Sequence, residues 1–484
     1  MKVLFVSPEV SPFSRTGGLG EVVGSLPVAL RKIGIDTRIL CPFYKETLDL
    51  PIKKLNRSIT FESQNQKITS EIGILKEELF PIPVYFLINT ELFGRSGIYA
   101  DKNGDYPDNW LRACVLSHAA VCIEKVIEWS PQIIHAHDWM AAPACAFVNA
   151  KIKSSGKPLK QSSVLTIHNL EHQGIFSDKF FGKTGLPGEF WGIDGFEHQG
   201  SLNLLKGGIQ HASKLTTVSP SYSSEIKTEK YGHGLDLSLK FRAADLIGIL
   251  NGIDEESWNP MQDLAIPSFI NPKSPKTGKK ICKDQLIKEM GLHTDKNLPL
   301  FGVVSRLYHQ KGLDLLASSL KELLKSKEAQ FVILGSGDIH LENIFLALAQ
   351  EFHGLIGVRI GFDDKLARKI FAGTDFFIMP SRFEPCGLAQ QYAMKYGSIP
   401  IARNTGGLSD TITPRNRGHL KANGYLFKEE KAESLLQKIK LAIKDWNQGH
   451  VYLTMQKNAL MKDCSWGNAA KKYSQVYEWS LENR

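Results

Sequence analysis

Two cations in the second half of the chain have the chemistry needed to act on a phosphorylated ligand. Arg306 and Lys311 stand five positions apart, in the segments Ser305-Arg306-Leu307 and Gln310-Lys311-Gly312. The guanidinium of Arg306 can make paired hydrogen bonds to a diphosphate, and the Lys311 ammonium can add a point charge. Together they would stabilise charge that grows on a leaving group in a transition state. The alternative interpretation is an ordinary pair of solvated surface cations.

A carboxylate stands in the most specific motif of the sequence, Pro380-Ser381-Arg382-Phe383-Glu384-Pro385-Cys386-Gly387-Leu388. Prolines on both sides of Glu384 stiffen the segment, so the carboxylate is held in one place. Gly387 is expected to open a helix whose N-terminal amides face a phosphate or a sugar hydroxyl. Cys386 has a nucleophile's thiol, but no histidine accompanies it in sequence, so we expect it to be a packing or contact residue.

Two glycine turns share the sequence Thr-Gly-Gly-Leu. One is Arg15-Thr16-Gly17-Gly18-Leu19-Gly20-Glu21 and the other is Asn404-Thr405-Gly406-Gly407-Leu408. Each follows a predicted strand, where glycines let backbone amides approach an anion at a helix N-terminus. In the first turn Val23 stands where a dinucleotide-binding fingerprint has its third glycine, and this turn is not a Walker A loop either. The turns predict anion sites, with a purely structural turn as the alternative.

Histidines and a carboxylate end two more predicted strands, in His135-Ala136-His137-Asp138-Trp139 and Thr166-Ile167-His168-Asn169-Leu170. Zinc is the alternative ligand for such a set, but His135 and His137 alternate on a strand and no third cluster of ligands is near in sequence. Asp138 is therefore expected to accept hydrogen bonds from sugar hydroxyls. A buried histidine without a role is the alternative for His168.

These loops require strands that end at a common edge. The first half predicts strands at 3–6, 37–40, 84–88, 133–137, 164–167 and 215–218, and helices at 20–33, 109–129 and 141–150. The second half predicts strands at 300–304, 331–334, 358–360, 376–379 and 399–402, and helices at 312–324, 364–372, 388–396 and 434–446. Short runs that are apolar on both faces favour parallel strands covered by helices, in doubly wound α/β sheets.

The chain is expected to form two domains, at 1–255 and 256–465, followed by a C-terminal helix at 466–484 whose docking partner stays open. Pro267, Pro272 and Pro275 indicate a linker at 260–283, and the polar alternation at 52–76 predicts an antiparallel insertion. Two tandem α/β domains place the default ligand site in a deep cleft between them, beyond the carboxyl ends of the strands.

Composition places limits on partners and compartment. The 484 residues carry a net charge of +9, which suits an anionic ligand or simply a moderately basic cytosolic protein. No block of like charge resembles a nucleic-acid arm, and no apolar run reaches the roughly 18 residues of a membrane span. Seven cysteines without a C-x-x-C pair favour a reducing compartment, and the N-terminal apolar run is too short for a signal peptide. We expect a cytoplasmic protein without nucleic-acid or membrane partners.

Taken together, the motifs resemble the bacterial glycogen synthase and plant starch synthase family over nearly the whole chain. Beside those above, the resemblance includes Leu250-Asn251-Gly252-Ile253-Asp254. It implies the GT-B fold, with two Rossmann-like domains, and a retaining transfer of glucose from ADP-glucose to the non-reducing end of an α-1,4-glucan. It implies no metal and no cofactor.

The resemblance also implies residue roles. It assigns catalysis to Glu384, Arg306, Lys311, Asp138 and His168. Donor binding falls to Arg15, Gly17, Gly18, Asn251, Arg306, Lys311, Cys386, Gly387, Leu388, Thr405, Gly406 and Gly407, and the glucan side to Asp138, His168, Asn169 and Glu21. No second carboxylate is evident for a covalent intermediate, so the hypothesis is a same-face transfer in which the leaving phosphate helps to deprotonate the incoming hydroxyl.

Two positions depart from the family pattern, because Arg15 replaces a lysine and Glu21 an aspartate. Arginine keeps the charge but is broader and planar, which leaves ADP-glucose and UDP-glucose both open as donors. A glucosyltransferase with a small sugar acceptor is one alternative. An epimerase-like protein or a non-catalytic glucan-binding protein is another, against which the presence of Arg306, Lys311 and Glu384 argues.

Overall fold

The computed structural model describes residues 1–64, 66–155, 161–294, 297–416 and 419–482, and the chain forms two compact units. Unit 1 contains residues 1–252 together with the chain from Trp466 onward, and unit 2 contains residues 253–465. Of the helices in the described ranges, none is long and apolar enough to cross a membrane.

A nine-stranded sheet forms the centre of unit 1, in the order β14-β13-β9-β8-β1-β2-β5-β4-β3. Most of its parallel strands are buried on both faces, as the apolar runs predict, and the edge strand β14 is only partly buried. The parallel strands are β1 Lys2–Val6, β2 Asp36–Pro42, β5 Val84–Ile88, β8 Ile133–His137, β9 Ser162–Ile167, β13 Lys214–Thr217 and β14 Leu246–Gly248. The predicted insertion is an antiparallel hairpin of β3 Ile52–Ser63 and β4 Gln66–Leu75, and β4 also pairs antiparallel with β5.

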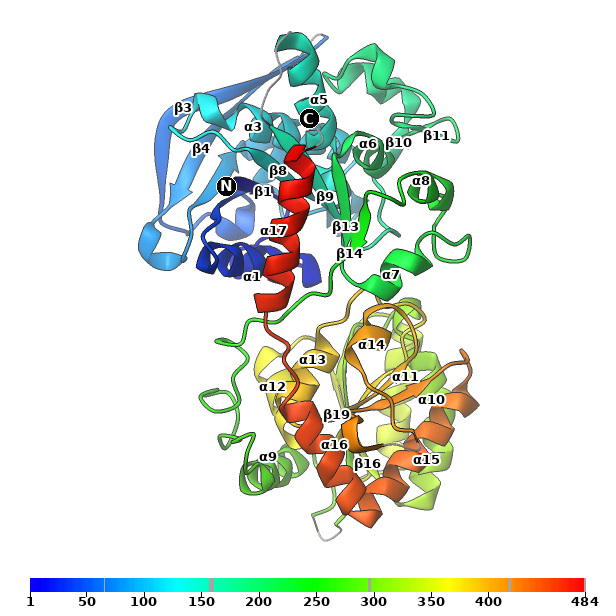
Figure 1. Ribbon diagram of the computed structural model, residues 1–484. Helices are drawn as coiled ribbons and strands as arrows, with labels where there is room; N and C mark the ends of the chain where they lie inside the picture. Colours follow the sequence, from blue (N-terminus) through cyan, green and yellow to red (C-terminus); the bar gives the residue numbers. More distant parts are fainter. Residues whose placement is uncertain (65, 156–160, 295–296, 417–418, 483–484) are drawn as a thin grey trace. The chain divides into compact units, whose positions relative to one another are not determined.

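Helices cover this sheet, and the chain's last helix is among them. The helices are α1 Gly18–Lys32, α2 Thr90–Phe93, α3 Asn109–Cys122, α4 Asp138–Ala141, α5 Pro143–Ser155, α6 Leu204–His211, α7 Pro220–Glu225, α8 Asp236–Phe241 and α17 Gly467–Glu482. Two small sheets accompany them, β10 Ile175–Ser177 with β11 Glu197–His198 and β12 Ser201–Asn203, and β6 Ala100–Asp101 with β7 Gly104–Asp105. Helix α17 contacts α1, β9 and β13 (red in Figure 1). Tyr473, Val476 and Tyr477 of α17 are buried there.

Unit 2 contains a six-stranded, wholly parallel sheet in the order β17-β16-β15-β18-β19-β20. The strands are β15 Leu300–Val304, β16 Gln330–Gly335, β17 Ile356–Ile360, β18 Phe376–Met379, β19 Ile399–Arg403 and β20 Tyr425–Phe427. The helices are α9 Lys276–Glu289, α10 Leu313–Ser326, α11 Ile339–Glu351, α12 Asp364–Gly373, α13 Ala389–Lys395, α14 Gly406–Thr411, α15 Ala432–Gln448 and α16 His450–Leu460.

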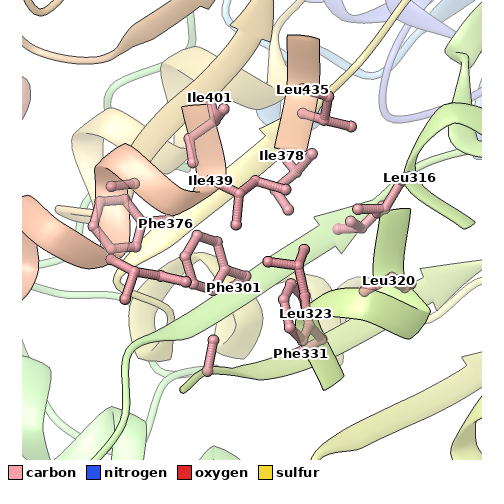
Figure 2. Packing of buried hydrophobic residues seen from close by; sticks show 14 of the residues in the cluster. Phe301, Leu316, Leu320, Leu323, Phe331, Phe376, Ile378, Ile401, Leu435 and Ile439 are labelled. Atoms are coloured by element: carbon pink, nitrogen blue, oxygen red, sulfur yellow. The ribbon is translucent and has the colours of Figure 1, made fainter. Parts of the chain in front are cut away.

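One face of this sheet packs against α10 and α15 (Figure 2). Phe301 of β15 lies between Phe331 of β16 and Phe376 of β18, with ring centres 5.2 and 4.9 Å away. Helix α10 adds Leu316, Leu320 and Leu323, a spacing of four and then three residues that keeps all three on one helical face. Burial of a side chain of this size contributes about 1.5–3 kcal/mol, so this layer holds the strands in place.

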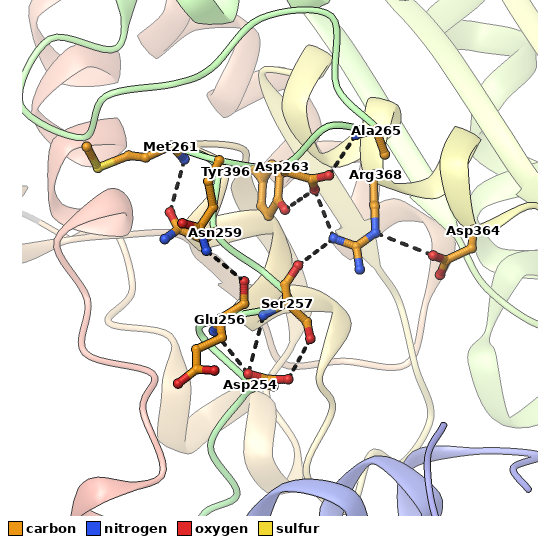
Figure 3. Close-up of polar contacts among 11 residues, drawn as sticks. Asp254, Glu256, Ser257, Asn259, Met261, Asp263, Ala265, Asp364, Arg368 and Tyr396 are labelled. Carbon is orange, nitrogen blue, oxygen red and sulfur yellow. Dashed lines mark hydrogen bonds and ion pairs between the residues drawn. The ribbon is translucent and has the colours of Figure 1, made fainter. Parts of the chain in front are cut away.

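The predicted linker at 260–283 is wrong, because this segment belongs to unit 2. Arg368 of α12 donates to the Ser257 carbonyl at 2.7 Å and to the Asp263 carboxylate at 2.9 Å. Tyr396 also donates to Asp263, as Figure 3 shows. The lysine-rich end of the segment is helix α9, in which Lys279 is buried. The prolines mark irregular backbone in a segment that these hydrogen bonds attach to unit 2. The chain passes from unit 1 to unit 2 after Gly252.

Other differences concern element ends. The helix expected at 109–129 ends at Cys122, where a turn of 3₁₀-helix covers Ile123–Lys125. The helix expected at 141–150 is α5, which begins at Pro143 and continues to Ser155, directly after the short helix α4. The helix expected to open at Gly387 begins at Ala389. Several elements were not predicted, namely β14, β20, the two small sheets and the helices α2, α6, α7, α8, α9, α11 and α16.

Candidate active site

Both sheets place their motif-bearing loops at the point where the strand order reverses. In unit 1 the first strand, β1, lies between β2 and β8, and in unit 2 the first strand, β15, lies between β16 and β18. Loops that leave the two central strands at such a point diverge and leave room for a ligand. The connections after β15 and β18 carry Lys311 and Glu384, Gly18 begins the helix that follows β1, and Asp138 begins the helix that follows β8.

In unit 2 the central feature is an ion pair between Lys311 and Glu384. The Lys311 ammonium lies 2.9 and 2.7 Å from the two oxygens of the Glu384 carboxylate. Ser381 donates to the same carboxylate at 2.9 Å. Glu384 is buried and Lys311 partly buried, so water screens their attraction less than at the surface. The site thus holds a fixed carboxylate with a cation directly against it.

Arg382 ties the two loops together. Its guanidinium makes two 2.7 Å hydrogen bonds to the Asp314 carboxylate and a further one of 2.7 Å to Glu430. It also donates to the carbonyl of His309 at 2.8 Å. This cation lowers the pKa of Asp314 through the hydrogen bonds it donates. Because His309 and Asp314 flank Lys311 in sequence, the network sets the distance between Lys311 and Glu384.

We expect Arg382→Met to lower kcat about tenfold while leaving KM for the donor within about threefold. Methionine keeps a long apolar stem but loses the paired charge-assisted bonds, so Lys311 and Glu384 drift apart. Thermal unfolding should show a loss of about 2–3 kcal/mol. Arg359→Met is the matched control, because Arg359 is exposed and has no ion pair among the described residues. Equal effects of the two variants would contradict the positioning role.

The second glycine turn packs directly on the Glu384 loop. A Cβ at Gly406, whose φ is +44°, would collide with the carbonyl oxygen of Glu384, and one at Gly407 would collide with the backbone of Cys386. The Gly407 amide donates to the Glu384 carbonyl at 3.1 Å. This amide was expected to face a phosphate, and the structure gives it a backbone acceptor instead. The two glycines let the Glu384 loop approach, which sequence alone did not indicate.

Three exposed apolar side chains after the strands β15, β16 and β17 were not predicted from the sequence. The Arg306 guanidinium is exposed and lies 5.6 Å from the ring centre of Tyr308. Ile339 and Phe362 are 68% and 85% exposed. The three apolar residues follow β15, β16 and β17, whose ends are joined by hydrogen bonds such as Leu307 N to Ser336 O and Gly361 N to Gly335 O. The signal available in the sequence was an aromatic residue within four positions of the end of a strand.

In unit 1 Asp138 accepts a 2.6 Å hydrogen bond from the His168 amide. Its φ is +56°, a conformation that Asp and Asn tolerate better than most residues. Burial raises the pKa of Asp138 to about 8, against the hydrogen bonds from the His168 and Asn169 amides, which lower it. The structure therefore brings three predicted residues together, with the carboxylate holding the backbone of the loop that carries His168 and Asn169.

The first glycine turn already holds an anion of the chain itself. The buried Glu9 carboxylate accepts from the Thr16 amide at 2.6 Å, the Thr16 hydroxyl at 2.9 Å and the Gly17 amide at 3.2 Å. Tyr99 donates to it at 2.8 Å. The Gly17 amide, expected to face the donor, thus binds Glu9. Neither Glu9 nor Tyr99 was predicted as part of the site.

The remaining predicted residues lie in the same two units. Arg15 forms an exposed ion pair with Glu21, so the two departures from the family pattern contact each other. Asn251 is buried at the end of unit 1, and Cys386 is buried in unit 2. No group of three or more metal-binding side chains occurs in the part of the chain that the structure describes.

Comparisons with known proteins agree with this arrangement. The model of the starch synthase catalytic domain matches residues 2–241, and that of glycosyl transferases group 1 matches residues 285–459. A glycogen synthase of Geotalea daltonii is 40% identical over 499 aligned residues, which cover all of both chains. The chain belongs to the glycogen synthase and starch synthase family. It is a glycosyltransferase, as the motifs predicted.

Other members of the family are similarly close. The glycogen synthase of Francisella tularensis subsp. novicida is 39% identical and covers 99% of each chain. The catalytic domain of starch synthase IV from Arabidopsis thaliana, solved with ADP and acarbose, is 31% identical, with a TM-score of 0.90 over 99% of each chain. Sucrose-phosphate synthase from Thermosynechococcus elongatus, at 14% identity and a TM-score of 0.60, shares the fold alone. These matches confirm the predicted GT-B fold.

Proposed function

We propose that this glycogen synthase family member transfers glucose, with retention, from ADP-glucose to the non-reducing end of an α-1,4-glucan and releases ADP. The Lys311–Glu384 pair at the strand-order reversal of unit 2 carries the proposal, because it sets a cation where a diphosphate would depart. The ADP-bound starch synthase at 31% identity supports this nucleotide. Seven cysteines without a disulfide suit a reaction in the cytoplasm.

Unit 2 supplies the donor side. Arg306 and Lys311 neutralise the diphosphate, and Thr405 and the 386–388 segment contact the phosphate and the glucose. The exposed ring of Tyr308 offers an apolar surface beside Arg306 on which the base can stack. Arg306 is the more exposed of the two cations, so it is free to reorient when the nucleotide arrives.

Unit 1 supplies groups for the sugar. Asp138, His168 and Asn169 contact the transferred glucose and the acceptor, and Asn251 and Gly18 contact the donor. When the donor binds, Arg15 leaves its ion pair with Glu21 and binds the phosphate instead. Glu21 then faces the glucan. The Arg15–Glu21 pair is exposed, so this exchange costs little free energy.

The carboxylates support same-face transfer without a covalent intermediate. Both oxygens of Glu384 are engaged by Lys311, and one also by Ser381. Asp138 is held by backbone amides, and its raised pKa favours the neutral acid, which is a poor nucleophile. The leaving phosphate then helps to remove the proton of the incoming hydroxyl. Trapping a glucosyl adduct on Glu384 or Asp138 would overturn this mechanism.

Nucleotide release measured with and without glycogen tests the proposed function. We expect ADP release from ADP-glucose to depend on glycogen, and kcat/KM for ADP-glucose to exceed that for UDP-glucose. A higher kcat/KM for UDP-glucose than for ADP-glucose would identify UDP-glucose as the donor instead. Release that requires a free sugar or a sugar phosphate would favour the small-acceptor alternative. Glycogen binding without release from either donor would favour a non-catalytic glucan-binding protein.

A further inference from the structure

Two buried histidines from neighbouring strands hydrogen-bond to each other beside the sugar-facing loop of unit 1. His137 ends β8 and His168 follows β9, the strand next to it in the sheet. Nδ1 of His137 lies 2.9 Å from Nε2 of His168. His168 belongs to the predicted site, whereas His137 was singled out only as a metal ligand of the rejected zinc alternative.

Either His137 or His168 donates the hydrogen bond between the two rings, and the surroundings of His137 show which of them does. Its other nitrogen, Nε2, is buried without a hydrogen-bond partner among the described residues. A neutral imidazole carries one N–H and one lone pair. If His168 donated, His137 would carry its N–H on Nε2, where no described atom accepts it. If His137 donates from Nδ1, only a lone pair stays unpaired, which is the less costly case because buried N–H groups without acceptors are rare.

The lowered pKa values of both rings support a bond in which one neutral ring donates an N–H and the other accepts it with a lone pair. Burial holds the pKa of His137 well below its usual range and lowers that of His168 to about 3. Both rings are therefore neutral around pH 7. Phe5 stacks on His137 with ring centres 5.3 Å apart, which keeps the His137 ring in the orientation that the bond requires.

The adjacent His135 ring does not compete for the bond. Its centre is 4.2 Å from that of His137, but its own nitrogens are engaged elsewhere. Nδ1 lies 2.8 Å from the hydroxyl of Tyr477 in α17, and Nε2 lies 2.6 Å from the hydroxyl of Thr166. His137 and His168 thus form an isolated pair.

We propose that His137 is a positioning residue whose Nδ1–H donates to Nε2 of His168 and thereby holds the proton of His168 on Nδ1. No described residue bonds to that nitrogen, so its N–H can donate to a hydroxyl of the transferred glucose. This last step rests on the proposed function, whereas the assignment of the two protons does not. Setting the tautomer of a partner histidine in this way orients a hydrogen bond that substrate uses.

The tautomer can be measured without a reaction. In protein with ¹⁵N-labelled histidine rings, ring nitrogen shifts distinguish Nδ1–H from Nε2–H, and His168→Asn identifies the signals of His168. We expect the intact protein at pH 7 to show His168 protonated on Nδ1 and His137 protonated on Nδ1. A His168 signal protonated on Nε2 would overturn the proposal whatever the enzyme's substrate is.

Two variants test the consequence for turnover. His137→Asn keeps an N–H at nearly the place of Nδ1, whereas His137→Leu has none. We expect His137→Leu to lower kcat at least about tenfold, with KM for glycogen within about twofold, and to let His168 populate both tautomers. His137→Asn should recover most of the lost kcat and the single tautomer. Thermal unfolding of both variants identifies any loss that is due to folding.

The outcomes separate this inference from the proposed function. Equal kcat for His137→Asn and His137→Leu, both folded, would overturn the positioning role. The predicted tautomer in a protein that transfers no glucose from either donor would sink the proposed function and leave the proton assignment standing.

Discussion

Lys311→Ala is expected to lower kcat by roughly a hundredfold to a thousandfold, the effect of removing one aligned group that stabilises transition-state charge. The ammonium is held against Glu384 in a partly buried site, so its charge acts with little screening. Because this interaction strengthens as the diphosphate leaves, KM for ADP-glucose should change less than kcat. Initial rates of ADP release at saturating glycogen measure both. Activity within tenfold of the parent would contradict the role.

The same substitution also affects stability, which supplies a control. Lys311→Ala leaves a buried carboxylate without its cation, a loss of about 3–5 kcal/mol in other proteins. The double variant Lys311→Ala, Glu384→Gln removes that charge and should regain most of the stability, but none of the activity. Lys440→Ala is the matched lysine control, because Lys440 pairs with Glu322 on the surface. Such a pair contributes about 0–1 kcal/mol.

Asp138→Ala is expected to lower kcat by about a hundredfold, while Asp138→Asn retains more activity. Alanine loses the acceptor for the His168 amide and also adopts φ +56° at a cost of about 1–2 kcal/mol. Asparagine tolerates that φ and keeps one acceptor oxygen. A shift of about 1 Å in the His168 loop is enough for a hundredfold loss. Steady-state rates of the two variants, with unfolding curves, provide the measurement, and equal rates would contradict the loop-holding role.

Asp138 should also make stability depend on pH. The native carboxyl keeps its proton up to about pH 8, whereas the unfolded one loses it near pH 4. Between these values the native state binds more protons, so its free energy of unfolding falls as pH rises, relative to Asp138→Asn. Urea unfolding of both proteins at pH 5 and pH 7.5 should show the difference moving in favour of the variant. A constant difference would contradict the raised pKa.

The strands were predictable because a buried strand is a short run of apolar residues, which can be recognised in the sequence. Residues 84–88, 133–137, 300–304 and 376–379 form strands with the predicted bounds. Each is a short apolar run, and each is buried along most of its length. Strand β20 has only three residues, Tyr425–Phe427, which gives no periodicity to detect. The linker prediction failed because prolines mark irregular backbone, whereas the Asp263–Arg368 contact that fastens this loop joins residues 105 positions apart.

The candidate site likewise has a part that the sequence predicted and a part that it could not predict. Residue types and their places at strand ends were enough to single out Arg306, Lys311, Glu384, Asp138 and His168. The sequence could not show that Lys311 meets Glu384, because they are 73 positions apart. They come together because the sheet order sets β18 beside β15 and Arg382 fastens the two loops.

By itself, then, the sequence determined the kinds of chemistry available, the α/β class and the family. Only the tertiary structure decided which polar groups form hydrogen bonds with each other. Glu9 occupies the amides of the first glycine turn, Gly406 and Gly407 make room for the Glu384 loop, and His137 bonds to His168 across 31 residues. The physical reason is that local propensity acts over a few residues, whereas a buried polar group must find a partner wherever the fold brings one within about 3 Å.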